Sequence, residues 1–150
     1  EMQQYAKKKI NHSSAKFIKS NAENLPFKDN YFDKYIISFC LRNVTDINMT
    51  ISEAFRVLKP GGEFYCLEFS KPESKFIELI YKKYKKNIIP WMGEKISKNK
   101  LAYRYLDESI DLFPEQDNLR NYFSSGGFKR IKYLNLFNGI VALHSGYKVL

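Results

Sequence analysis

YIISFCLRNVTD, at residues 35–46, runs from a nearly continuous apolar segment through a polar turn into the start of a helix. The apolar part, 35–41, predicts a strand that is buried on both faces of a sheet. A helix is predicted over 46–58, because apolar residues recur there on one stripe. Thr45 or Asp46 is placed to cap its first turn. The stretch therefore predicts a buried strand that is followed at once by a helix.

The flanking segments continue this alternation of strands and helices. Pro60-Gly61-Gly62 predicts the end of the helix, and 63–69 predicts a second buried strand. Upstream, the sequence predicts the end of an amphipathic helix, a strand and a loop, at 2–10, 16–20 and 21–30. Downstream, it predicts three helices and two strands, at 73–89, 100–113, 114–123, 129–137 and 140–149. Asn138-Gly139 is a favoured hairpin turn between these last two strands.

This order of elements predicts the fold class. Alternating buried strands and helices indicate an α/β layer fold with a mainly parallel sheet, here ending in a C-terminal antiparallel hairpin. A chain of 150 residues has the size of one domain, so we expect a single domain over 1–150. Ligands of such sheets lie beyond the carboxyl ends of the strands, and the loops after the strands are therefore the candidates for a site.

The composition narrows the class of protein without choosing a function. The chain is 44% hydrophobic and 16% aromatic, which excludes a disordered protein. No run approaches the about 18 apolar residues of a spanning helix. Cys40 and Cys66 lie in apolar runs, so we expect buried thiols rather than a disulfide, and we predict no metal site. The net charge of +9 predicts attraction to an anionic membrane surface or to nucleic acid, but no recognised nucleic-acid motif is present, so no nucleic-acid partner is expected.

Four segments carry a resemblance to a known family: NAENLPF at 21–27, SFCLRNVTD at 38–46, RVLKPGG at 56–62 and LEFSK at 67–71. In order and spacing they resemble the C-methyltransferases of ubiquinone and menaquinone biosynthesis. LKPGG alone marks only the wider class of Rossmann-like methyltransferases, whereas LRNVTD and LEFSK are much narrower. The resemblance continues downstream and covers nearly the whole chain, through 103–106, 108–110, 113–114 and 139–148.

The resemblance implies a class I, Rossmann-like methyltransferase that uses S-adenosylmethionine to methylate a ring carbon of a polyprenyl benzoquinol or a demethylmenaquinol. The family's glycine-rich cofactor loop and its ribose-binding acidic residue precede the segment that matches Glu1-Met2. We therefore expect residues 1–150 to be the C-terminal portion of a single methyltransferase domain, with its natural start upstream. Because both elements hold the cofactor, we expect the chain alone to bind it poorly and to be inactive.

Cofactor-contact positions of the family match Asn21, Ala22 and Ser38. Asn21 and Ala22 resemble contacts to the adenine end, where an amide donor and a small neighbour suit a flat ring. The alternative for Asn21 is a turn residue, and for Ser38 a hydroxyl bonded to the backbone of its strand.

The candidate catalytic residues are Arg42 and Asn43. A guanidinium after a buried strand can stabilise a phenolate, and an amide can orient the ring oxygen. The alternative is a structural ion pair or a strand-end cap. His144 could act as a general base, although a strand histidine is more often structural. Tyr103 and Tyr105 lie two apart on a predicted helix, so at most one readily points into a quinone pocket.

The basic stretch from 71 to 100 predicts peripheral membrane contact through Lys82, Lys83, Lys85, Lys86 and Trp91. Its alternative is a solvated helix face. Similarity to mitochondrial members of the family favours the matrix side of the inner membrane if the source is eukaryotic. If the source is bacterial, the expected location is the cytoplasm. A homodimer or a biosynthetic complex is left open. Two other functions also stay open: an inactive, basic membrane-surface module, and a methyltransferase with another small-molecule acceptor.

Overall fold

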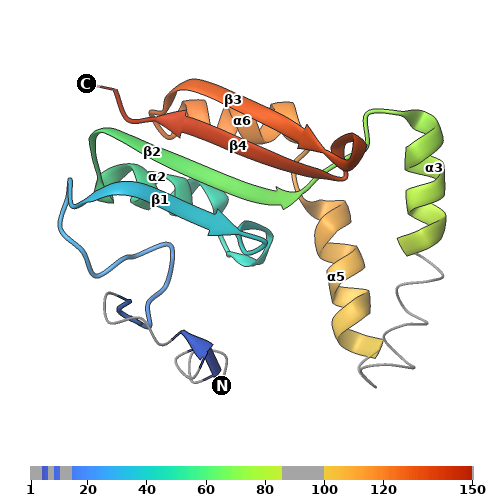
Figure 1. The fold of residues 1–150 in the computed structure, drawn as a ribbon, viewed down its shortest axis with the longest axis horizontal. Coiled ribbons are helices and arrows are strands. Elements are labelled where there is room, and N and C mark those ends of the chain that lie inside the picture. Colours follow the sequence, from blue (N-terminus) through green and yellow to red (C-terminus); the bar gives the residue numbers. More distant parts are fainter. Residues whose placement is uncertain (1–4, 7–8, 11–14, 86–99, 150) are drawn as a thin grey trace.

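The computed structural model describes residues 5–6, 9–10, 15–85 and 100–149. Helices and strands alternate along much of the chain (Figure 1), in the order β1 (Phe32–Ser38), η1 (Leu41–Asn43), α2 (Ile47–Val57), β2 (Leu58–Phe69), α3 (Lys75–Lys83), α5 (Lys100–Leu112), α6 (Gln116–Ser125), β3 (Lys129–Leu136), η4 (Phe137–Gly139) and β4 (Val141–Tyr147). The strands form one sheet in the order β1-β2-β4-β3. The α/β class is confirmed.

The sheet is mixed. β1 and β2 are parallel, whereas β4 is antiparallel to both β2 and β3. The C-terminal hairpin is therefore confirmed, and its turn contains Asn138 and Gly139 with positive φ angles of 58° and 87°. Among the described strands, only the β1–β2 pair satisfies the prediction of a mainly parallel sheet. The C-terminal hairpin joins the sheet through β4, which lies next to β2. Both of its pairings, β2–β4 and β3–β4, are antiparallel.

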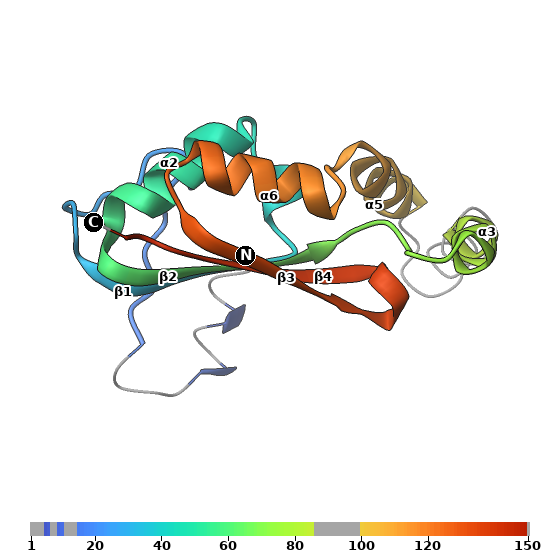
Figure 2. The same ribbon diagram turned by 90° about the horizontal axis from the view of Figure 1, so that it is seen from above.

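One face of the sheet is covered by α2 and α6 (Figure 2), and the core lies between these helices and the sheet. Asp46 caps α2, because its carboxylate accepts the backbone N–H groups of Asn48 and Met49. Phe64 of β2 stacks on Phe123 of α6 with ring centroids 4.6 Å apart, and both rings are fully buried. The predicted helix and one of its two proposed caps are thus confirmed.

The burial of β1 on both faces was wrongly predicted. Ile37 points into the core, but Ile36 is 70% exposed on the opposite face. No described helix covers that face, and β1 is the edge strand of the described sheet. Cys40 follows this strand and is also exposed, whereas Cys66 in the central strand β2 is buried; both thiols are free.

Two other predicted elements differ from the structure, and two more are only partly described. The segment 16–20 is not a strand, and the only bridge nearby joins Asn21 to Asn24. Pro114 lies before the N-cap Glu115 of α6 rather than in its first turn. The predicted helices 2–10 and 73–89 lie partly outside the described residues. Within the described ranges, no helix combines the length and apolar character needed to cross a membrane.

His144 lies in the core rather than at the edge of the sheet. Its side chain is between Phe123 and Tyr133, and its Nε2 donates to the carbonyl oxygen of Gln116 at 3.0 Å. Burial lowers the pKa of this imidazole below its ordinary value, since the charged form would lose its hydration. The structure therefore supports the structural interpretation of His144.

This pKa predicts an acid-sensitive stability. The unfolded chain takes up a proton near pH 6.5 while the folded chain resists it, so the free energy of unfolding falls as the pH drops below about 6.5. Chemical denaturation at pH 7.5 and 5.5 measures this change. We expect a smaller loss of stability in His144→Gln, which has no imidazole at this position. An equal loss in both proteins would contradict the assignment.

Candidate functional site

The carboxyl ends of β1 and β2 lead into the candidate site. β1 passes into the short helix η1, and α5 lies just beyond this end of the sheet (Figure 1). Leu41, the first residue of η1, is fully buried and anchors it in the core. The next two residues, Arg42 and Asn43, therefore lie just beyond the end of β1 and near α5, and their catalytic role stays a prediction.

Arg42 forms an ion pair with Glu68 of β2. The guanidinium Nη1 lies 2.7 Å from the carboxylate Oε1, and the two side chains are 10% and 1% exposed. The backbone N–H of Arg42 also donates to Glu68 Oε2 at 3.4 Å. The same Nη1 donates to the carbonyl oxygen of Phe39 at 2.7 Å. Glu68 therefore holds both the side chain and the backbone of this turn.

The buried pair leaves one donor of Arg42 unused. Its Nε is buried and has no hydrogen-bond partner within the described structure. A buried guanidinium donor without an acceptor is costly, so the position of this side chain depends on its bonds to Glu68 and Phe39. Sequence reasoning treated Glu68 only as part of a family motif, although a carboxylate in an apolar strand indicates a buried ionic partner.

Arg42 lines a small pocket of about 220 Å³ beside α5. Tyr105 is on its wall, and its hydroxyl donates to Asn43 Oδ1 at 3.0 Å. Tyr103, two residues away, is not among the lining residues, since residues two apart on a helix do not share a face. The other lining residues are Ile47, Glu108, Ser109, Leu112, Phe113 and Pro114. The pocket thus combines apolar walls with a guanidinium, a phenol and a carboxylate, and the Asn43 amide holds the phenol from outside the lining.

Glu23 joins two of the predicted site segments. Its Oε1 accepts the backbone N–H of Thr45 at 2.6 Å and that of Asp46 at 3.1 Å. The loop with Asn21 and Ala22 is therefore tied to the turn that follows Asn43. Sequence reasoning did not single out Glu23, because nothing local shows which distant N–H groups a loop carboxylate will meet.

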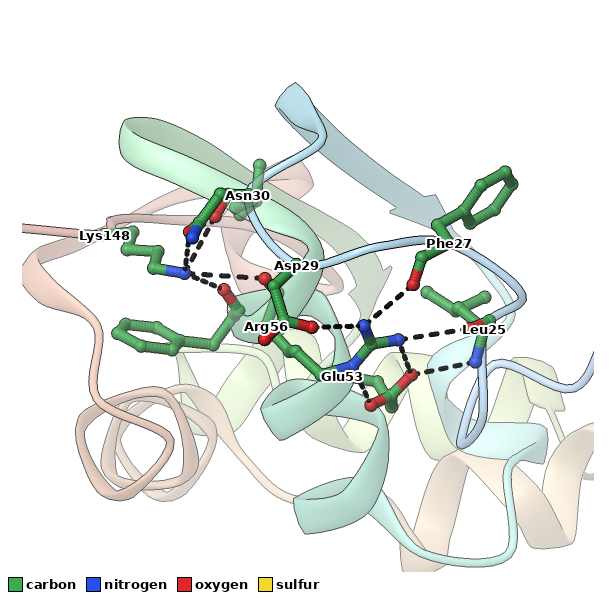
Figure 3. Close-up of polar contacts among 9 residues, drawn as sticks. Leu25, Phe27, Asp29, Asn30, Glu53, Arg56 and Lys148 are labelled. Atoms are coloured by element: carbon green, nitrogen blue, oxygen red, sulfur yellow. Dashed lines mark hydrogen bonds and ion pairs between the residues drawn. The ribbon is translucent and has the colours of Figure 1, made fainter.

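The rest of this loop is held by α2 (Figure 3). Arg56 pairs with Glu53 and Asp29, and it donates to the carbonyl oxygens of Phe27 at 2.8 Å and Leu25 at 3.1 Å. Glu53 in turn accepts the N–H of Leu25 at 2.8 Å. A segment without secondary structure thus obtains its hydrogen bonds from one helix face.

Lys148 fastens the end of the chain to the same region (Figure 3). Its ammonium donates to the carbonyl oxygens of Phe55 and Leu58, each at 2.8 Å, at the end of α2. It also donates to Asn30 Oδ1 at 2.8 Å. A cation at this position complements the negative end of the helix and binds carbonyl groups that no further helical turn satisfies.

The three predicted cofactor residues lie at the surface near this edge of the sheet. Asn21 is exposed and accepts the N–H of Glu23 at 3.1 Å, which is a local turn contact. Ala22 is half-buried beside it, and Ser38 is exposed at the last position of β1. An amide, a small residue and a hydroxyl suit the adenosine end of a nucleoside ligand. Their roles stay predictions.

The predicted membrane surface is smaller than expected. Lys85 is only 4% exposed, since it lies between Asp107 at 2.9 Å and Asp111 at 2.5 Å of α5. It cannot face a lipid headgroup. Lys86 and Trp91 lie outside the described residues. Lys82 and Lys83 are exposed, and Lys82 pairs with Glu78 one turn earlier on α3.

The family model described as the ubiE/COQ5 methyltransferase family matches residues 1–148. The chain belongs to this family. It is 55% identical over 134 residues to the ubiquinone/menaquinone biosynthesis C-methyltransferase UbiE of Rickettsia prowazekii, with 89% of this chain and 54% of that protein aligned. It is 52% identical over 153 residues to the protein of the same name from Rickettsia bellii, with 99% and 62% aligned. The family member described here thus spans little more than half the length of these relatives.

Solved structures support the fold independently. A SAM-dependent methyltransferase from Aquifex aeolicus matches 97% of this chain and 61% of its own with a TM-score of 0.64 and 13% identity. A SAM-dependent methyltransferase from Thermotoga maritima matches 87% of this chain and 63% of its own with a TM-score of 0.61 and 23% identity. The family member therefore has the class I methyltransferase fold expected from the sequence.

Breaking the Arg42–Glu68 pair should destabilise the protein. We expect Glu68→Gln to lower the free energy of unfolding by about 3–5 kcal/mol, because a buried guanidinium then lacks its counter-charge. The double variant Arg42→Met/Glu68→Leu should recover most of this loss, since an apolar pair needs no compensation. Urea denaturation measures both. A single variant as stable as the wild type would contradict the buried pair.

Removing the ammonium of Lys148 should also cost stability. Lys148→Met leaves the carbonyl groups at the end of α2 without a donor, with an expected loss of about 1–3 kcal/mol. Lys132→Met, at an exposed position of β3, is the matched control and should change stability little. Thermal denaturation compares the two, and equal effects would show that the carbonyl contacts contribute nothing.

Proposed function

We propose that this protein takes part in S-adenosylmethionine-dependent methylation of a ring carbon of a polyprenyl quinol, either a benzoquinol or a demethylmenaquinol. The observation that carries the proposal is the turn at the end of β1, where Glu68 holds Arg42 and Tyr105 contacts Asn43. This turn lines a pocket at the edge of the sheet where ligands of such folds bind. The names of the Rickettsia relatives support the same chemistry.

The side chains of this turn suit a ring that carries oxygen. Arg42 lines the pocket while Glu68 holds its Nη1, so its guanidinium is positioned to stabilise negative charge that develops on a ring oxygen. Because the Glu68 carboxylate offsets much of its charge, Arg42 acts through directed hydrogen bonding more than through net charge. Asn43 and Tyr105 orient the ring by a shared hydrogen bond, and Leu112 and Phe113 pack against its apolar edge.

S-adenosylmethionine, when bound, would supply an electrophilic methyl group that replaces the hydrogen on the ring carbon, which leaves as a proton. Asn21, Ala22 and Ser38 would hold the adenosine end, on the side of the site where Glu23 bonds to the backbone of Thr45 and Asp46. This sequence contains no G-x-G motif, so the backbone cradle of the family is not among its residues. The chain would thus supply the quinol pocket and one side of the cofactor site.

Two other functions are outcomes of the same test. An inactive binding module would bind lipid without turnover, and another acceptor would be methylated in place of the quinol. The expected mitochondrial location has no support among the relatives compared here, which are bacterial. Membrane contact through Lys82 and Lys83 is still a proposal.

Transfer of a radiolabelled methyl group from S-adenosylmethionine to a demethylated quinol tests the proposal, with the longest chain that the gene encodes. We expect turnover, and we expect Arg42→Lys to lower kcat by about a hundredfold, because the planar donor array is lost. Arg120→Lys on the exposed face of α6 is the matched control and should leave kcat unchanged. Absence of turnover would favour the binding module, and full activity of Arg42→Lys would remove Arg42 from the site.

A further inference from the structure

An apolar groove of about 520 Å³ lies between α3 and the turn of the C-terminal hairpin, on the right of Figure 1. Its lining includes Ile77, Ile80 and Tyr84 from α3, Phe137 and Ile140 from the turn, and Phe69 from β2. Several of these side chains are open to solvent: Ile80 is 51% exposed and Phe137 is 79% exposed. An exposed apolar surface of this kind indicates a site for an apolar partner.

The groove begins at the candidate site. Phe69, the last residue of β2, lines it, and the Arg42 guanidinium lies 5.3 Å from the centroid of the same ring. Phe39, in the turn before Arg42, contacts Phe69 with centroids 4.9 Å apart. Because Phe69 lies against the Arg42 guanidinium and also lines the groove, the groove is next to the candidate site.

Both ends of α3 are fixed, which keeps the groove open. At its start, Ser74 donates its backbone N–H to Asn138 Oδ1 at 3.3 Å, and Glu73 accepts from Asn135 Nδ2 at 2.7 Å. Just past its end, Lys85 is buried between the two aspartates of α5 described above. These polar contacts lie at the ends of the helix, and the apolar side chains between them form the walls. A buried lysine paired with two carboxylates is thus better explained as a wall anchor than as a membrane contact.

We propose that this groove binds the isoprenoid tail of the quinol whose ring lies at Arg42. The inference rests on the proposed function and adds to it a second subsite that recognises the hydrocarbon chain. A single hydrocarbon chain suits a groove that is lined almost entirely by apolar atoms, since it needs no hydrogen bonds.

Quinols with the same ring and tails of zero to three isoprene units test the proposal in the methyl-transfer assay. Each five-carbon unit should lower KM by about tenfold until the groove is filled, because each adds about 0.3 kcal/mol per buried atom. The value of kcat should change little, since the tail does not touch the reacting carbon. A KM that is independent of tail length would overturn the proposal.

A pair of neighbouring variants locates the effect. Ile80→Glu places a charge in the groove and should abolish the dependence of KM on tail length, while the tailless quinol is methylated as before. Leu79→Glu on the same helix is the matched control, because Leu79 is 69% exposed and does not line the groove. If both variants keep the tail dependence but weaken binding to anionic vesicles, α3 contacts the membrane and the proposal is wrong.

Calorimetric titration with farnesol separates this inference from the proposed function, because it requires no turnover. We expect farnesol to bind the wild type and Leu79→Glu, and to bind Ile80→Glu at least tenfold more weakly. Binding with this pattern in a protein that methylates no quinol would overturn the proposed function and leave the groove intact. No binding of farnesol to the wild type would overturn the groove.

Discussion

The carboxylate of Glu68, buried in the central strand β2, requires compensation that the core cannot provide. It obtains this from the guanidinium and the backbone N–H of Arg42 and from the N–H of Phe69. A charge that must be satisfied at one point of the sheet thus determines where the turn after β1 lies. Asn43 and its contact with Tyr105 follow from that position, and Phe69, which lines the apolar groove, lies against the same guanidinium.

Around this pair, charged side chains hold segments that lack secondary structure. Glu23 and Arg56 act on the backbone of the neighbouring loops, and Lys148 does so at the end of α2. Hydrogen bonds from charged groups to the backbone are stronger than neutral ones and are directional, so they can fix a loop without burying it. The candidate site is therefore a set of loops positioned by electrostatics on an aromatic core.

Local signals allowed much of the fold to be predicted. The stripe and cap of α2 and the Asn138-Gly139 turn each depend on residues close in sequence, and the motif at 38–46 located Arg42 and Asn43 at the edge of the sheet. The exposed face of β1 could not be predicted, since it depends on which helices cover the sheet. The burial of Lys85 was missed for a similar reason, because its partners Asp107 and Asp111 lie more than twenty residues away on α5. The role of Glu68 as the partner of Arg42 could not be predicted, because the two residues are 26 apart in sequence and meet only in the folded sheet.

Amide hydrogen exchange of the turn after β1 tests most directly whether Glu68 positions the site. The N–H groups of Phe39 and Asn43 bond to backbone carbonyl oxygens within or beside this turn, at 2.9 and 3.0 Å. We expect slow exchange of both in the wild type and exchange at least tenfold faster in Glu68→Gln, with β4 amides such as that of Leu143 changing only as far as global stability does. Equal protection of the turn relative to β4 in both proteins would show that Arg42 and Asn43 are held in place without Glu68.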